Sequence, residues 1–331
     1  MKKNLGERIL PNQGWRCLWL LATAALLVSC GGAGLPAACP PACSGLNLRG
    51  RALANVNLAN ANLQRTILRN AQLQHANLTQ ADLAGADLSD TNLTYINLTG
   101  ARLTGANLQR ANLTGAQLAG ADLAGADLTE ATLTRVDLTQ TRLTAVVLNK
   151  ARLIGARLWG VDLSGAQLVG ANLAGARLAG ANLAGANLAQ KDPHQIGANL
   201  NGADLRGINL NGANLTGAQL RGAILTRAQL EGAVINAQLL GADLTKSNLQ
   251  NADLTDAVFS GAQLTGANMV AANLTNTRVN GANLNGANLT KATLVYSDTT
   301  TGMTMTLKLV GARYDQATRF PAGFIVGNET K

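Results

Sequence analysis

The chain has 331 residues, of which 47% are hydrophobic but only 3% aromatic, which excludes a core built from large rings. Glycine is abundant at 36 residues while proline is scarce at 6, a combination that excludes collagen and proline-rich linkers. The formal net charge is +9, a mild excess that favours acidic partners only weakly and is typical of a solvated surface.

A basic segment followed by an apolar run opens the chain. Four Lys and Arg side chains precede the apolar residues 18–28. This run is too short to span a bilayer as a helix, which needs roughly 20 residues, and it has the length of a signal-peptide core. We therefore predict a short signal helix within residues 1–29.

The apolar run ends in Leu-Val-Ser-Cys at residues 27–30, which resembles the bacterial lipobox, where small residues precede an acylated Cys. The resemblance implies a signal peptide over residues 1–29 and a lipid on Cys30. That lipid would anchor the protein to a membrane of the bacterial envelope, either the outer membrane facing the periplasm or the cell surface. Ordinary secretion with cleavage near Ala37 or Ala38 is the alternative.

Residues 30–45 are rich in Gly, Ala and Pro and are predicted to be a tether between the lipid and the folded body. Cys39 and Cys43 lie within this tether. Two thiols without a neighbouring His or further Cys make a poor zinc site. In an exported protein these two residues are candidates for a small disulfide.

A five-residue unit then repeats from residue 46 to residue 295. In the unit Ala101–Gly105, Ala lies two places before Leu103, a polar residue lies between them, and Gly closes the unit. A period of five is neither the helical period of 3.6 nor the strand period of 2. Each unit is therefore predicted to form one corner of a coil.

The tandem Ala-(Asn/Asp)-Leu pattern over residues 46–295 resembles the pentapeptide repeat family. The resemblance implies an all-β fold, a right-handed quadrilateral parallel β-helix with four units per coil and with Ala and Leu pointing inward. Gly in the last position of a unit tolerates a positive φ at each corner. Four units per coil predict about twelve coils, which at about 4.8 Å per coil form a rod near 60 Å long.

Charged side chains recur at intervals of twenty residues, which independently favours four units per coil. Two columns alternate in sign along the chain: Asp82, Arg102, Asp122, Arg142 and Asp162 form the first, and Asp90, Arg110, Glu130 and Lys150 form the second. Exposed pairs of this kind contribute about 0.2–1 kcal/mol each, so we expect them to set register more than to hold the fold.

The leucine phase breaks twice. An insertion near residues 189–198 separates Leu188 from Leu200, and one residue is missing near residues 236–237. The insertion is predicted to bulge outward as a loop, which is either a contact loop for a partner or a tolerated insertion. Its central residues are Lys191, Asp192, Pro193 and His194.

Residues 296–331 follow the last repeat and are predicted to be a C-terminal cap or tail. An open β-helix end leaves backbone groups and apolar side chains uncovered. Tyr314, Phe320 and Phe324 are the side chains that we expect to cover it.

Little in the sequence suggests catalysis. Only two histidines are present, His75 and His194, and they lie in unrelated settings without a nucleophile motif, P-loop or dinucleotide fingerprint. We therefore expect no enzyme activity, no cofactor and no metal site. Tyr95 and Trp159 occupy outward positions and are candidates for a contact patch.

The sequence favours a non-enzymatic scaffold, anchored to the envelope membrane through lipid, that contacts an unknown protein partner. A DNA mimic that shields a topoisomerase is the alternative from another class, since some pentapeptide proteins resemble B-DNA. That mimicry needs an acidic surface and a cytoplasmic location, so the basic charge and export signal disfavour it, and nucleic acid is not expected as a partner. A surface that binds polyanionic polymer is a variant of the first hypothesis. The oligomeric state stays open.

Overall fold

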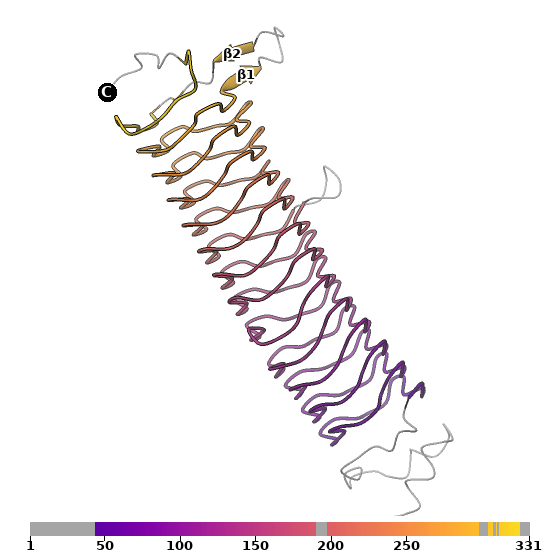
Figure 1. Ribbon diagram of the computed structural model, residues 1–331. Coiled ribbons are helices and arrows are strands. Elements are labelled where there is room, and N and C mark those ends of the chain that lie inside the picture. The colour runs from indigo at the N-terminus through magenta and orange to yellow at the C-terminus, as the bar shows by residue number, and fades with distance from the viewer. Residues whose placement is uncertain (1–43, 190–196, 298–303, 307–308, 310, 325–331) are drawn as a thin grey trace, which may run out of the picture.

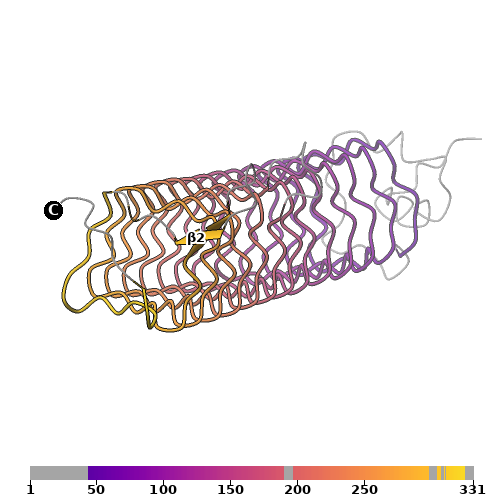
Figure 2. The ribbon, with the colours of Figure 1, turned by 90° about the horizontal axis from the view of Figure 1, so that it is seen from above.

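The computed structural model describes residues 44–189, 197–297, 304–306, 309 and 311–324. These residues form a long stack of coils that follow one another in chain order along a rod (Figures 1 and 2). The predicted signal helix and tether, with Cys30, Cys39 and Cys43, and the insertion residues Lys191–His194 lie outside the described residues. Among the residues that are described, no helix is long and apolar enough to cross a membrane.

Neighbouring coils are joined by parallel β-bridges between residues twenty apart, such as Asp82 with Arg102. Four five-residue units therefore complete one coil, and the rod has four faces. We number the faces by their first bridges: Asn47–Ile67 on face one, Ala52–Gln72 on face two, Asn57–Asn77 on face three and Asn62–Asp82 on face four.

The core is a set of stacked leucine rows lined by alanine. In the unit that begins at Ala101, Leu103 is 0% exposed and Ala101 is 1% exposed. The same two positions are buried along almost all of the described repeat, which confirms that Ala and Leu point inward. Each buried Leu contributes about 1.5–3 kcal/mol of transfer free energy, so the rows supply the main favourable term.

Each corner has a residue with φ near +60° in the last position of the unit. Gly105 has a φ of 63°, and its N–H donates to the carbonyl oxygen of Ala124 on the next coil at 3.0 Å. The same conformation occurs at many residues that are not glycine, including Ala145 with a φ of 54° and Lys150 with a φ of 56°. A left-handed backbone costs residues other than glycine roughly 1–2 kcal/mol. The hydrogen bonds and packing between neighbouring coils must therefore offset this cost at each such corner.

Both phase breaks are absorbed without loss of pairing. Across the insertion, Asn172 of face two pairs with Asn199, so the coil that contains the insertion is longer than the others. Across the deletion, Gln219 of face two pairs with Gln238, so that coil is one residue shorter than the rest. In both cases the columns on the four faces continue in register.

A short antiparallel hairpin interrupts the end of the stack. Strand β1 (Val295–Ser297) pairs with strand β2 (Thr304–Thr306), and both lie near the C-terminal end of the rod (Figure 1). The insertion, the deletion and this hairpin all follow a strand of face one, which contributes Asn187, Val234 and Thr293 just before them. The three irregularities therefore lie along one edge of the rod.

The tail after the hairpin adds two further β-bridges to the stack. Arg313 pairs with Asn283 on face three, and Arg319 pairs with Asn288 on face four, both in parallel. The rings of Phe320 and Phe324 stack at 5.1 Å and pack against the end of the core. Tyr314 meets Phe320 edge to face at 5.6 Å, and its own side chain is largely exposed.

Candidate interaction surface

The first charged column lies on face four, and each of its arginines forms an ion pair with the aspartate on the preceding coil. Arg102 lies 3.2 Å from the carboxylate of Asp82, and Arg142 lies 3.4 Å from that of Asp122. Asp162 is held differently, because its Oδ1 accepts hydrogen bonds from the backbone N–H of Ser164 and from the side-chain amide of Asn182. The bond from the Ser164 backbone is the main reason that the pKa of Asp162 lies below its ordinary value.

The second charged column runs along the edge that follows face one. Arg110 donates to both oxygens of Asp90, at 2.6 and 2.9 Å, and Lys150 lies 3.8 Å from Glu130. Arg69 approaches Asp90 from the preceding coil at 3.4 Å. The hydrogen bond from Arg110 is the largest of the effects that hold the pKa of Asp90 below its usual value.

The polar residue before each Leu has a structural role that the sequence pattern did not reveal. In the unit Ala111–Gly115, Oδ1 of Asn112 accepts the backbone N–H of Thr114 at 3.1 Å and its hydroxyl at 2.7 Å. The same turn recurs wherever Asn or Asp holds this position, for example at Asp253 and Asn214. It satisfies a corner N–H that has no partner on the neighbouring coil. The preference for Asn and Asp over Gln was the available signal.

Face three carries two arginines on successive coils. Arg157 and Arg177 form the single β-bridge pair, within the described part of the chain, that sets two cations opposite one another. Trp159, two residues after Arg157, is 46% exposed. The guanidinium carbon of Arg177 lies over the Trp159 ring, 5.8 Å from its centroid.

Two more arginines lie beside this pair. Arg152 is exposed on the adjoining strand of face two. Arg135 lies at the corner between faces two and three, and its Cγ would be 3.5 Å from a Cβ added at Gly155, between Arg152 and Arg157. We call Arg135, Arg152, Arg157, Arg177 and Trp159 the arginine–tryptophan patch. Two aspartates adjoin the patch: Asp137 lies 3.5 Å from Arg157, and Asp204 is the β-bridge partner of Arg177 on the next coil.

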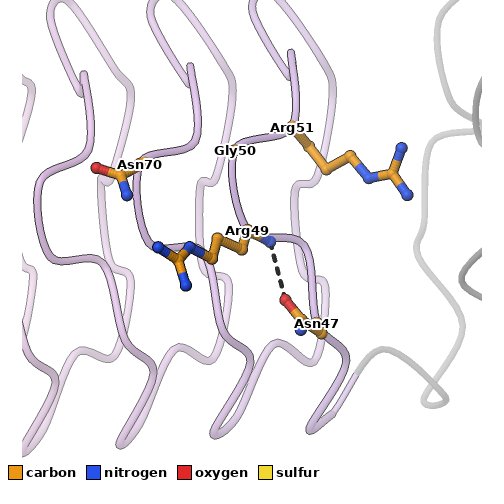
Figure 3. A pocket seen from close by; sticks show the side chains of 5 residues that line it. All are labelled: Asn47, Arg49, Gly50, Arg51 and Asn70. Carbon is orange, nitrogen blue, oxygen red and sulfur yellow. Dashed lines mark hydrogen bonds between the residues drawn. The ribbon is translucent and has the colours of Figure 1, made fainter.

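A pocket of about 570 Å³ lies on the first described coils (Figure 3). It is lined by Asn47, Arg49, Gly50, Arg51 and Asn70. The Arg49 and Arg51 side chains extend away from one another in Figure 3, so the pocket does not direct both guanidinium groups at one ligand. Oδ1 of Asn47 accepts the backbone N–H of Arg49 at 3.1 Å, which makes Asn47 part of the turn.

The remaining aromatic contact joins His75 and Tyr95. Their rings stack at 5.1 Å with planes 9° apart, so His75 is a stacking partner that the sequence did not predict. Tyr95 is 58% exposed, and its ring covers Gly115 on the following coil, where a Cβ would come within 2.5 Å of it. Across the described residues, no three His, Cys, Asp or Glu side chains gather as a metal site would require.

Comparison with known proteins identifies the repeat. The family model described as "Pentapeptide repeats" matches repeatedly over most of the chain. The matched stretches are residues 43–80, 81–118, 111–149, 151–190, 198–236, 237–276 and 267–298. Members of this family form right-handed quadrilateral β-helices, in agreement with the four-sided coils. No curated protein matches the chain.

The solved structures similar to this chain include two pentapeptide repeat proteins. HetL, a pentapeptide repeat protein of the cyanobacterium Nostoc involved in heterocyst differentiation regulation, is 33% identical over 80% of this chain and 92% of its own, with a TM-score of 0.27. A pentapeptide repeat protein of the Arabidopsis thaliana thylakoid lumen is 36% identical over 29% of this chain and 68% of its own, with a TM-score of 0.28. QnrB1, a plasmid-mediated fluoroquinolone resistance protein, is 19% identical over 52% of this chain and 92% of its own, with a TM-score of 0.30.

Proposed function

The chain belongs to the pentapeptide repeat family, and we propose that it is a non-enzymatic, envelope-anchored scaffold whose faces contact another protein. One observation carries the proposal. The leucine core runs without a break from coil to coil, while the polar columns all face outward in fixed register. Such a rod holds its surface side chains at a regular spacing and loses little conformational entropy when a partner binds.

Anchoring of the rod is supported by the Leu-Val-Ser-Cys pattern that ends at Cys30. We expect Cys30→Ser to abolish incorporation of labelled fatty acid and to release the protein from membranes. Cys17→Ser is the matched control, because Cys17 lies inside the leader that cleavage removes. Labelling that persists in the Cys30 variant, or that disappears in both variants, would contradict the lipid anchor.

Contact with a protein can be tested in cells, one face at a time. A photo-crosslinking amino acid placed at one outward position of each face samples the whole perimeter of the rod. We suggest Ile67 for face one, Asn112 for face two, Gln117 for face three and Arg142 for face four, because all four side chains are exposed. A discrete crosslinked product from one or two faces is expected. Four silent faces in intact cells would rule the scaffold out.

The alternative of a DNA mimic is disfavoured by the charge columns. Mimicry of a phosphate backbone needs rows of negative charge. The face-four column instead alternates in sign, with Arg102 and Arg142 each paired to an aspartate. The polyanion-binding variant has one observation in its favour, the arginine–tryptophan patch, and is separated from protein contact below.

A further inference from the structure

We propose that the arginine–tryptophan patch is the surface at which this protein binds an acidic segment of its partner protein. The proposal rests on the scaffold function and gives that scaffold a contact surface and a partner chemistry. It assigns the carboxylates of the partner to Arg135, Arg152, Arg157 and Arg177, and an aromatic or aliphatic side chain of the partner to Trp159.

The Arg157–Arg177 pair has no explanation in the stability of the stack. Like charges set directly opposite one another on neighbouring strands destabilise a sheet. The face-four column avoids this arrangement, since Asp82 with Arg102 and Asp122 with Arg142 alternate in sign. A bound anion would neutralise the two facing guanidinium groups, so the arrangement favours a ligand that brings negative charge.

Arg177 remains available because its neighbour on the next coil is already engaged. Asp204 pairs with Arg177 across the bridge, yet its carboxylate binds Arg206 through two hydrogen bonds, at 2.8 and 2.7 Å. Arg177 lies over Trp159 instead. Among the described residues, no carboxylate lies within ion-pair distance of Arg135, Arg152 or Arg177.

Stacking on Trp159 orders the Arg177 guanidinium before any partner arrives. A guanidinium held over an indole keeps its edge N–H groups free for a bidentate carboxylate, and it loses less entropy on binding than a free side chain does. Arginine and tryptophan are also the residues most enriched where protein partners bind most tightly. The exposed indole therefore indicates a partner with side chains to pack on it.

The composition of the patch favours an acidic protein segment over other polyanions. Single-stranded nucleic acid is usually held by several aromatic platforms on which successive bases stack, whereas this patch has one ring, Trp159. A purely ionic polymer would need the cations but not the exposed indole. Charge complementarity with an acidic chain would also steer encounter and set register along the rod.

The test is a titration of the purified full chain with a fluorescein-labelled copolymer of glutamate and tyrosine, followed by anisotropy at an ionic strength of about 0.1 M. We expect saturable binding that the double variant R157Q/R177Q weakens about tenfold or more, which corresponds to at least 1.4 kcal/mol. Trp159→Ala should weaken binding of the copolymer more than binding of polyglutamate, because polyglutamate has no ring to pack on the indole.

The matched control is the double variant R227Q/K246Q. It removes the same charge from successive coils, since the Arg227 N–H donates to the carbonyl of Thr245 beside Lys246. We expect less than a twofold effect on binding from this control. Equal losses in the two double variants would overturn the proposal, because binding would then follow net charge alone. Absence of saturable binding to the unmodified chain would overturn it as well.

Alginate, a polymer of uronic acids, separates protein from polysaccharide as the occupant. Alginate binding that is as tight as copolymer binding, and that depends equally on Trp159, would overturn the assignment to a protein segment. These titrations use purified protein and do not depend on anchoring. A chain that is lipidated at Cys30 and crosslinks through another face would therefore keep the scaffold function while excluding this patch.

Discussion

Arg110 donates two hydrogen bonds to Asp90 on the preceding coil, with Nε 2.6 Å from Oδ1 and Nη2 2.9 Å from Oδ2. Arg69, from the coil before, lies 3.4 Å from the same carboxylate. Asp90 therefore joins three coils along one edge, and its pKa lies below its ordinary value mainly because Arg110 donates to the ionised form.

Arg110→Gln should raise the pKa of Asp90 toward the ordinary value of 3.8. A depressed carboxyl pKa stabilises the folded state above the unfolded pKa, and this stabilisation is lost as the pH falls through the folded value. The stability difference between the two proteins should therefore be present at neutral pH, decline once the pH falls below 3.8, and vanish below the folded pKa of Asp90. An NMR titration of the Asp90 carboxyl carbon measures the shift directly, and Arg142→Gln should leave it unchanged.

Arg142→Asp should destabilise the rod by about 1 kcal/mol at low salt, because it removes the pair with Asp122 and adds a like charge beside it. Urea unfolding measured at increasing ionic strength should show the loss shrinking as the charges are screened. Arg152→Asp is the control, since its column neighbours are Thr132 and Asn172 and its other neighbours are cations. If the two variants lost the same unfolding free energy and responded to salt in the same way, the assignment of Arg142 to a column of alternating charge would be wrong.

Leu123→Asp should cost several kcal/mol, because it places an unpaired carboxylate among buried leucines at a position that is 1% exposed. Ala119→Asp introduces the same side chain at an exposed position one corner earlier and should change stability by less than about 0.5 kcal/mol. Melting temperatures of the two variants, measured side by side, test the assignment. Two similar values would be incompatible with it.

Asn214→Ala should cost about 1 kcal/mol. The change leaves the N–H and hydroxyl of Thr216 without the oxygen that accepts them at 3.0 and 2.7 Å. Gln238→Ala is the matched variant, since Gln238 holds the same position in its unit and is exposed. Equal denaturation midpoints for the two variants would mean that the turn hydrogen bond contributes nothing.

Ala145→Gly should stabilise the protein by up to about 1 kcal/mol, because Ala145 has a φ of 54° that glycine adopts without strain. Gly105→Ala should do the opposite at a φ of 63°, although nothing lies within 4 Å of the added Cβ. Thermal unfolding of the pair thus isolates backbone strain from steric contact. A gain in stability from Gly105→Ala would show that the corners are not strained.

The inward pair of each unit and the twenty-residue coil could be predicted from sequence. The five-residue period of Leu predicts the inward pair. The alternating charges of residues twenty apart, such as Asp122 and Arg142, predict the length of the coil. The turn made by Asn112 was missed because its one signal in the sequence is the preference for Asn and Asp over Gln, and the backbone N–H that the side chain accepts becomes evident only in the structure. The β-bridges made by Arg313 and Arg319 were missed because the tail lacks the five-residue period.

The arginine–tryptophan patch could be predicted from the sequence only in part. Trp159 stood out as an outward aromatic, but its contact with Arg177 needs the coil geometry that places the two on successive turns. The same holds for His75 and Tyr95, which are twenty residues apart and stack only because four units close a coil. Pairs of this kind become predictable once the coil length is known, since a search at that interval finds them.

The insertion, the deletion and the β1–β2 hairpin all follow face one, and this has a consequence for engineering the rod. A change of one residue within a strand would turn inward side chains outward along the rest of that coil. The edge after face one instead absorbs added or missing residues while Asn199 and Gln238 resume pairing beyond it. Foreign epitopes or protease-cleavable loops can therefore be grafted between Ile235 and Leu239. They would be displayed from the edge after face one, and the other three edges would be unaltered.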